Sequence, residues 1–259
     1  MKLRSPEAYA KGIVVSMQDY SLLTWHAISA IFSRPRYIAD TFMQMDLVGF
    51  GSLPIVILTG FFTGCVLTLQ SATSLQQFGA ANMTGRLVAL SMIKELGPVL
   101  TGLMVSGRNA SGMASELGSM KVTEQIDAMR ALGTDPVRKL VAPRLVATVT
   151  MMFFLTIISD ACGIAGGAGV AVGLLGLKGS AFFHTAFRSL VFGDVAEGLV
   201  KPLFSGFIIA TIGCFYGLRT TGGTQGVGRA TTRAVVVSSV LIILLDFLVT
   251  KMMIGIFGR

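Results

Sequence analysis

Apolar residues occur in long runs that are separated by shorter polar segments, and this alternation is the main pattern of the chain. No charged residue lies between Asp46 and Arg86. The predicted spans are residues 47–70, 87–107, 145–175, 202–218 and 235–258. An α-helix needs about 20 apolar residues to cross the hydrocarbon core of a bilayer. The pattern therefore predicts an all-α integral membrane protein with about five transmembrane helices.

The composition supports this class. The 259 residues are 53% hydrophobic and 13% charged, whereas a soluble domain carries about 25% charged residues. A net charge of +8 would suggest nucleic-acid binding in a soluble protein, but basic residues also collect in the cytoplasmic loops of membrane proteins. We expect no nucleic-acid partner. Cys65, Cys162 and Cys214 lie in apolar runs without a C-x-x-C pair, so we expect no metal site.

Residues 1–46 form a separate N-terminal region. Apolar residues around Leu22, Trp25 and Phe32 predict an amphipathic helix in the membrane interface, with the indole at headgroup level. Pro35 is expected to end or bend it. The alternative is a short helix packed on the other helices. No cleavable signal peptide is visible, and residues 47–259 form the predicted transmembrane domain.

The distribution of Lys and Arg predicts the orientation. Most of them lie before the first span, between spans two and three, and between spans four and five. The basic residues assigned to the opposite side are Arg86, Lys178, Arg188, Lys201 and Arg259. Because basic residues favour the cytoplasmic side, the N-terminus is expected in the cytoplasm and the C-terminus in the periplasm.

Residues 108–144 are the longest polar segment. Val122, Ile126 and Met129 recur at helical spacing, and Gly133 can close that helix. Asp135 and the following proline predict the start of a second short helix, which Pro143 would stop. A charged amphipathic element of this kind suits docking to a soluble partner. The alternative is an ordinary solvated loop.

Three stretches resemble the MlaE family of ABC transporter permeases. They are LVALSMIKELGP at residues 87–98, ELGSMKVTEQIDAM at residues 116–129, and GRATTRAVV at residues 228–236. The resemblance extends from about residue 40 to the end of the chain. It implies a permease that moves phospholipids or related lipids between the bacterial inner membrane and the outer envelope, and so maintains outer-membrane lipid asymmetry.

The resemblance also implies partners. Two permease copies would form a homodimer, bound by a separate ABC ATPase, an MCE-domain periplasmic lipid-binding protein and a small STAS-domain cytoplasmic subunit. The chain itself would not be an enzyme and would bind no cofactor, because ATP and Mg²⁺ belong to the ATPase; no Walker A motif occurs here. The coupling helix that meets the ATPase would span about residues 121–132. Its expected docking residues are Glu116, Val122, Glu124, Gln125, Ile126, Asp127, Met129 and Arg130.

Lys94 and Glu95 lie near the middle of the second span, where ionisable residues are costly and usually functional. Ser91 shares roughly one helix face with Glu95. We expect this pair to line a central cavity and to meet the polar head of a lipid. By resemblance, the pocket would also include Leu67, Leu69 and Gln70. The alternative is a structural ion pair with another span, such as one between Glu95 and Lys251.

Lone acids occur in two other spans, at Asp160 and Asp246. A proton-coupled secondary carrier would use such carboxylates, and this is the competing class of function. The plainer interpretation is an interhelical hydrogen bond or an ion pair with Arg108 or Lys251. A membrane scaffold without transport activity is a third class.

Arg229 and Arg233 share a face if their segment is helical. They could meet anionic lipid headgroups or the ATPase. Simple cytoplasmic anchoring explains them equally well.

Overall fold

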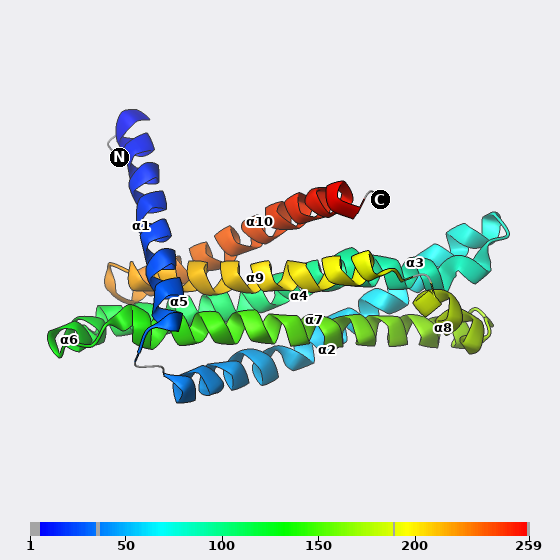
Figure 1. Ribbon diagram of the computed structural model, residues 1–259, viewed down its shortest axis with the longest axis horizontal. Helices are drawn as coiled ribbons and strands as arrows, with labels where there is room; N and C mark the ends of the chain where they lie inside the picture. The colour runs from blue at the N-terminus through cyan, green and yellow to red at the C-terminus, as the bar shows by residue number, and fades with distance from the viewer. Residues whose placement is uncertain (1–5, 35–36, 189, 258–259) are drawn as a thin grey trace.

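The chain folds as an elongated bundle of long helices (Figure 1). The computed structural model describes residues 6–34, 37–188 and 190–257, and all regular elements in these ranges are helical. Five helical stretches are long and apolar enough to cross a membrane. They are Ile38–Gln77, Ala81–Val122, Val137–Gly173, Phe192–Leu218 and Gly223–Gly255. The prediction of an all-α membrane protein with five spans is confirmed.

Some spans are single helices and others contain π-helical turns. The single helices are α2 (Ile38–Gln77), α9 (Phe192–Leu218) and α10 (Gly223–Phe257). The second span begins with the 3-10 turn η1 (Ala81–Met83). It continues through α3 (Thr84–Ser91), the π turn η2 (Met92–Leu96), α4 (Gly97–Val105), the π turn η3 (Ser106–Ala110) and α5 (Ser111–Val122). The third consists of η4 (Val137–Val141) and α7 (Ala142–Gly173). Such π turns are frequent at functional sites.

Short helices mark the two ends of the bundle. In Figure 1, α6 (Gln125–Ala131) lies at one end and α8 (Gly179–Arg188) at the other, and the N-terminal helix α1 (Pro6–Phe32) stands at a steep angle to the long helices near the α6 end. Five crossings place the start of α2 and the end of α10 on opposite sides. Lys2, Arg4, Arg36 and Arg259, which contributed to the predicted orientation, lie outside the described residues.

The helices are longer than the apolar runs. The predicted first span ends at residue 70, but α2 continues to Gln77. The hydroxyl of Thr73 donates to the carbonyl of Leu69 at 2.7 Å, and Ser71 and Ala72 are buried. Helix ends outside the membrane depend on such hydrogen bonds and on packing, which hydropathy does not measure.

Three predicted breaks are also wrong. The fifth helix does not begin at residue 235, because α10 starts at Gly223. Pro202 does not start the fourth span, because α9 starts ten residues earlier at Phe192. Pro143 does not stop a short helix but sits in the first turn of α7, where a missing N–H is tolerated.

The most extensive contact between helices in the described chain joins α2 and α7. The Gly60-x-x-x-Gly64 spacing on α2 faces Ser159 and Gly163 on α7. A Cβ at position 60 would lie 2.6 Å from the carbonyl oxygen of Ser159, and one at position 64 would overlap the carbonyl of Gly163. Small residues thus let the two backbones meet directly, which is how membrane helices gain packing energy without a hydrophobic driving force.

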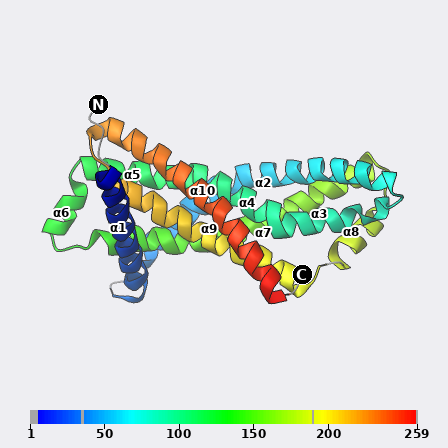
Figure 2. The same ribbon diagram turned by 90° about the horizontal axis from the view of Figure 1, so that it is seen from above.

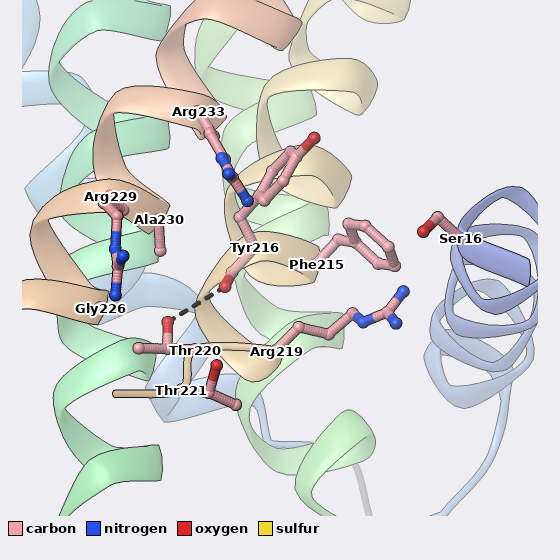
Figure 3. Close-up of a pocket in the computed structure, with 10 residues that line it drawn as sticks. All are labelled: Ser16, Phe215, Tyr216, Arg219, Thr220, Thr221, Gly226, Arg229, Ala230 and Arg233. Carbon is pink, nitrogen blue, oxygen red and sulfur yellow. Dashed lines mark hydrogen bonds between the residues drawn. The ribbon is translucent and has the colours of Figure 1, made fainter. Parts of the chain in front are cut away.

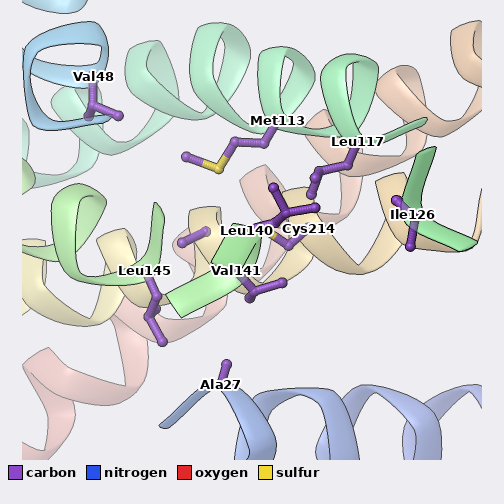
Figure 4. Packing of buried hydrophobic residues seen from close by; sticks show 10 residues of the cluster. Ala27, Val48, Met113, Leu117, Ile126, Leu140, Val141, Leu145 and Cys214 are labelled. Atoms are coloured by element: carbon purple, nitrogen blue, oxygen red, sulfur yellow. The ribbon is translucent and has the colours of Figure 1, made fainter. Parts of the chain in front are cut away.

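The N-terminal helix combines features of both predicted forms. Trp25 is 69% exposed and Phe32 77% exposed, whereas Ala27 is fully buried. Ala27 packs with Leu140 and Leu145 in an apolar cluster near the α6 end (Figure 4). Tyr20 also hydrogen-bonds Thr211 of α9 at 2.8 Å. The helix runs steeply across the long axis of the bundle near the α6 end (Figure 2), with one face on the protein and large apolar residues such as Trp25 and Phe32 exposed.

Candidate functional site

A network of charged side chains joins three spans inside the bundle. Its centre is Lys201 of α9, which is only 1% exposed. The Lys201 Nζ lies 2.9 Å from a Glu95 oxygen, 3.0 Å from Asp246 on α10 and 3.5 Å from Glu197. Lys94 forms a second centre, 3.1 Å from Asp194 and 3.2 Å from Glu197. Two cations and four carboxylates therefore connect the second, fourth and fifth spans.

The helix geometry of the second span exposes a further acceptor to this network. Pro98 has no N–H and cannot bond the carbonyl four residues earlier, which belongs to Lys94. Lys201 donates a hydrogen bond to that carbonyl at 2.7 Å. The adjoining π turn η2 carries both Lys94 and Glu95, and Thr250 of α10 donates to Glu95 at 3.2 Å. Pro98 therefore leaves the Lys94 carbonyl without its helical partner, and Lys201 takes that place.

The network is reached from small cavities. A cavity of about 220 Å³ is lined by Lys94, Asp194, Glu197, Met253 and Ile254, among others. The side chains of Lys94 and Glu95 are 28% and 40% exposed, so a polar group that enters the bundle can meet them. Lys201 is therefore buried within the network, whereas Lys94 and Glu95 are partly accessible.

A second cavity lies on the other side of η2. Leu96, Leu67 and Gln70 line this open cavity of about 360 Å³. Two of the three α2 residues assigned by resemblance therefore lie together beside the π turn. Leu69 is 40% exposed and lies outside this lining. Ser91 ends α3, half-buried.

The other intramembrane acids differ from each other. Asp246 pairs with Lys201, not with Lys251. Asp160 is buried on α7 against Gly97, and its Oδ1 has no hydrogen-bond partner among the described residues. Neither acid pairs with Arg108, whose guanidinium lies over Gly51 of α2. The predicted alternative of a Glu95–Lys251 pair is also wrong, because Lys201 occupies that place.

Sequence reasoning missed Asp194, Glu197 and Lys201. Lys201 was assigned to an outer loop and counted there for the orientation, whereas it lies inside the fourth span. The available signal was their spacing: positions 194, 197 and 201 recur at three and four residues, which places them on one face of a helix.

The polar segment between the second and third spans turns sharply rather than forming one helix over 121–132. Lys121 and Val122 end α5, and α6 starts at Gln125. Between them Glu124 adopts a left-handed conformation with φ of 61°, which is uncommon for a residue with a side chain. Gly133, with φ of 78°, closes α6 as predicted, and the Thr134 amide bonds the Met129 carbonyl at 2.9 Å.

Charges hold this corner together. Lys121 bonds Asp127 at 2.7 Å, and Arg130 lies 3.5 Å from the same carboxylate. The hydrogen bond from Lys121 lowers the pKa of Asp127. Gln125 donates to Thr123 at 3.0 Å. Glu116, one helix earlier, pairs with the buried Arg144 of α7 at 2.7 Å.

The two faces of α6 have different environments. Ile126 is fully buried among Leu117 and Leu140, and Met129 packs against the same cluster. The apolar stripe therefore holds α6 on its own bundle and is not free for a partner. Glu124, Gln125, Asp127 and Arg130 are exposed, as are Val122 at 37% and Leu132 at 83%.

Arg229 and Arg233 lie on α10 near its start. Both are exposed and, among the described residues, neither has an ion-pair partner. They line a cavity of about 500 Å³ together with residues of α1 and α9. The structure places them far from η2, toward the α6 end of the bundle.

Comparisons with known proteins agree on one family. A family model described as Permease MlaE matches residues 41–252. A probable ABC transporter permease protein of Rickettsia typhi is 43% identical over 238 residues, 92% of each chain. The Haemophilus influenzae intermembrane phospholipid transport system permease protein MlaE is 38% identical over 213 residues, 82% of each chain. The chloroplast protein TRIGALACTOSYLDIACYLGLYCEROL 1 of Arabidopsis thaliana is 36% identical over 212 residues, 82% of this chain and 61% of that protein. The chain therefore belongs to the MlaE permease family.

Proposed function

We propose that this chain is the permease subunit of an ABC transporter that moves phospholipids between the inner membrane and the outer envelope. The observation that carries the proposal is the charged network around Lys201, which lies inside a five-span bundle of the MlaE family. Ionisable groups at this depth mark substrate pathways. The Haemophilus relative, which is named for phospholipid transport, supports the substrate class.

In this mechanism the exposed parts of the network meet the lipid head. Lys94 offers a cation to the phosphate, and Glu95 offers a carboxylate to an amine or hydroxyl of the head. Leu67, Leu96 and the cavity between them take the start of an acyl chain. Lys201 stays buried and holds the three spans in register, so its role is to position Glu95.

A separate ATPase supplies the energy. We assign its docking surface to the exposed face of residues 121–132, where α5 turns into α6. The exposed residues there include Glu124, Arg130 and Leu132. Glu116 is paired with Arg144 of α7, so displacement of α5 would be passed directly to the third span. ATP and Mg²⁺ belong to the ATPase, and the chain contributes transport without hydrolysis.

The remaining assembly follows from the family and the charge pattern. The α6 end would face the cytoplasm and the α8 end the periplasm, where an MCE-domain protein would exchange lipid. A second copy of the chain would pack on α10. Only 17% of the apolar stretch of α10 is buried within this chain, against 67% of that of α9. A small STAS-domain subunit is proposed on the cytoplasmic side.

The secondary-carrier alternative has less support. Glu95 and Asp246 share the same lysine, so both are ion-pair partners that join spans rather than isolated carboxylates. Asp160 makes no hydrogen bond through its Oδ1 to any described residue.

Replacing Glu95 by glutamine is expected to lower ATP-driven lipid transfer at least tenfold without unfolding the protein. Lys201 keeps Glu197 and Asp246 as partners, and the amide keeps the size of the side chain. The loss would be one charge-assisted contact to the substrate, worth about 1.5–3 kcal/mol. Transfer of fluorescent phospholipid between proteoliposomes and the purified MCE partner measures it.

The matched control is Asp46→Asn, which neutralises an exposed acid at the start of the first span. Its transfer rate should equal that of the unaltered protein. Normal transfer by the Glu95→Gln variant, at a normal yield of assembled complex, would remove Glu95 from the substrate path.

Changing the charge of Glu124 and the apolar side chain of Leu132, both exposed between α5 and the end of α6, is expected to weaken binding of the ATPase. Glu124→Lys combined with Leu132→Asp changes two exposed positions, so the bundle should remain folded. Interface residues of this kind cost about 2 kcal/mol or more when lost, which is at least a tenfold drop in affinity. Co-purification of the ABC ATPase with the tagged permease measures this drop. Arg188→Glu on α8, at the other end, should leave ATPase recovery unchanged, and full recovery with the double variant would place docking elsewhere.

A further inference from the structure

A basic cavity lies between α1, α9 and α10, at the α6 end of the bundle and away from the Lys201 network. It measures about 500 Å³. Figure 3 shows Arg229 and Arg233 on α10 beside Tyr216 and Thr220, with Ser16 of α1 on the far side. Arg219 at the end of α9 completes the lining. Three guanidinium groups therefore surround one space.

The arginines are not equivalent. Arg219 is held by Asp19 of α1 at 3.1 Å and lies over the Phe215 ring at 5.2 Å. Its charge is therefore already compensated. Arg229 and Arg233 have no such partner within the described part of the chain. Planar guanidinium groups bind phosphate through paired hydrogen bonds, so two uncompensated donors in a cavity favour an anionic oxygen ligand.

An apolar groove continues from this cavity. It has a volume of about 1090 Å³ and shares Ser16, Phe215, Tyr216, Arg219 and Arg233 with the basic cavity. Beyond these residues its lining becomes mainly apolar. The further lining residues are Lys11, Gly12, Val15, Met17, Tyr20, Ile212, Val237 and Leu241. One continuous space therefore has a basic end and an apolar end.

The same groove separates α1 from the bundle. Contacts of α1 with α9 are limited to a few residues, among them Tyr20 with Thr211 and Asp19 with Arg219. Val15 and Met17, which line the groove, are 42% and 66% exposed. An apolar surface between an oblique helix and α10 would be covered in a membrane by acyl chains.

We propose that this site binds one phospholipid with an anionic headgroup, taken from the leaflet at the α6 end. The phosphate lies between Arg229 and Arg233, and the acyl chains follow the groove between α1 and α10 past Val237 and Leu241. Charge complementarity selects the head, and the apolar groove selects a lipid over a free phosphate. The site is distinct from the transport path at Glu95. If the α6 end faces the cytoplasm, as the proposed function has it, the lipid comes from the cytoplasmic leaflet. Binding at this site does not depend on transport.

Photo-crosslinking tests this site on the full-length protein. The protein is reconstituted in phosphatidylcholine nanodiscs with a trace of phosphatidylglycerol that carries a photoactivatable acyl chain, and labelled peptides are mapped by mass spectrometry. We expect labels on residues 15–20 of α1 and 237–241 of α10. Arg233→Gln should lower this labelling about fivefold, because a basic residue near anionic lipid contributes roughly a factor of five in binding, and Arg233→Lys should restore part of it.

Controls separate the alternatives. Arg34→Gln removes the same charge from an exposed position beside α1 but outside both cavities, and it should leave the labelling unchanged.

Equal labelling by a phosphatidylcholine probe would show that the site does not distinguish an anionic headgroup from a zwitterionic one, and it would overturn the proposal. Displacement of the probe by inorganic phosphate at millimolar concentration would do the same, because the site would then bind a free anion. A label confined to the contact between two copies of the chain would assign the groove to the dimer instead. Because the assay contains no ATPase, its failure would leave the transport proposal untouched, and failure of transport would leave this site standing.

Discussion

Lys201→Met is expected to be the most destabilising single substitution in the bundle. Methionine keeps an unbranched side chain, slightly shorter than lysine, but removes the cation that Glu95, Glu197 and Asp246 share. Removing one partner of a buried ion pair costs about 3–5 kcal/mol because the remaining charges are left uncompensated. The unfolding midpoint in detergent should fall by roughly 10 °C, and lipid transfer should be lost.

Two comparisons make this result specific. Lys251→Met changes the same residue type on α10 at an exposed position, and its unfolding midpoint should stay within about 1–2 °C of the unaltered protein. Asp246→Asn should cost less stability when combined with Lys201→Met than it does alone, since groups in one network are not additive. Strictly additive effects would mean that Asp246 and Lys201 do not depend on each other.

Gly64→Ala is expected to separate the first and third spans. Its new methyl group would overlap the backbone carbonyl of Gly163, and a backbone atom cannot move aside as a flexible side chain can. Overpacking of this kind typically costs about 1–3 kcal/mol. The measurement is the unfolding midpoint of the purified protein, together with its yield from membranes.

Gly169→Ala is the matched control for that prediction. Gly169 lies on α7, in the glycine-rich part that also contains Gly163, but no other described part of the chain comes within 4 Å of a Cβ built there. Alanine is favoured over glycine in helices by about 0.5–1 kcal/mol, so this variant should be as stable as the unaltered protein or slightly more so. Equal losses at positions 64 and 169 would show that helix contact is not the cause.

Part of the candidate site was predictable from the chain alone. Lys94 and Glu95 stand out because charges are rare within apolar runs, and their position in the second span predicts a functional role. Pro98 indicated a free carbonyl at Lys94, which the structure confirms. The polar segment around Ile126 was recognisable from its spacing, although its apolar stripe proved to face the protein.

The sequence by itself determined the class of the protein, its five spans and its family, because hydropathy and local motifs are properties of neighbouring residues. It could not determine that Lys201 is the partner of Glu95, since these residues lie on different helices and only packing brings them together. Nor could it determine where helices end beyond the membrane, as at Gln77 and Gly223, where hydrogen bonds and tertiary contacts replace hydropathy as the deciding force. The tertiary structure decided which charges compensate each other, because the energy of an ion pair depends on distance and burial, and a linear chain specifies neither.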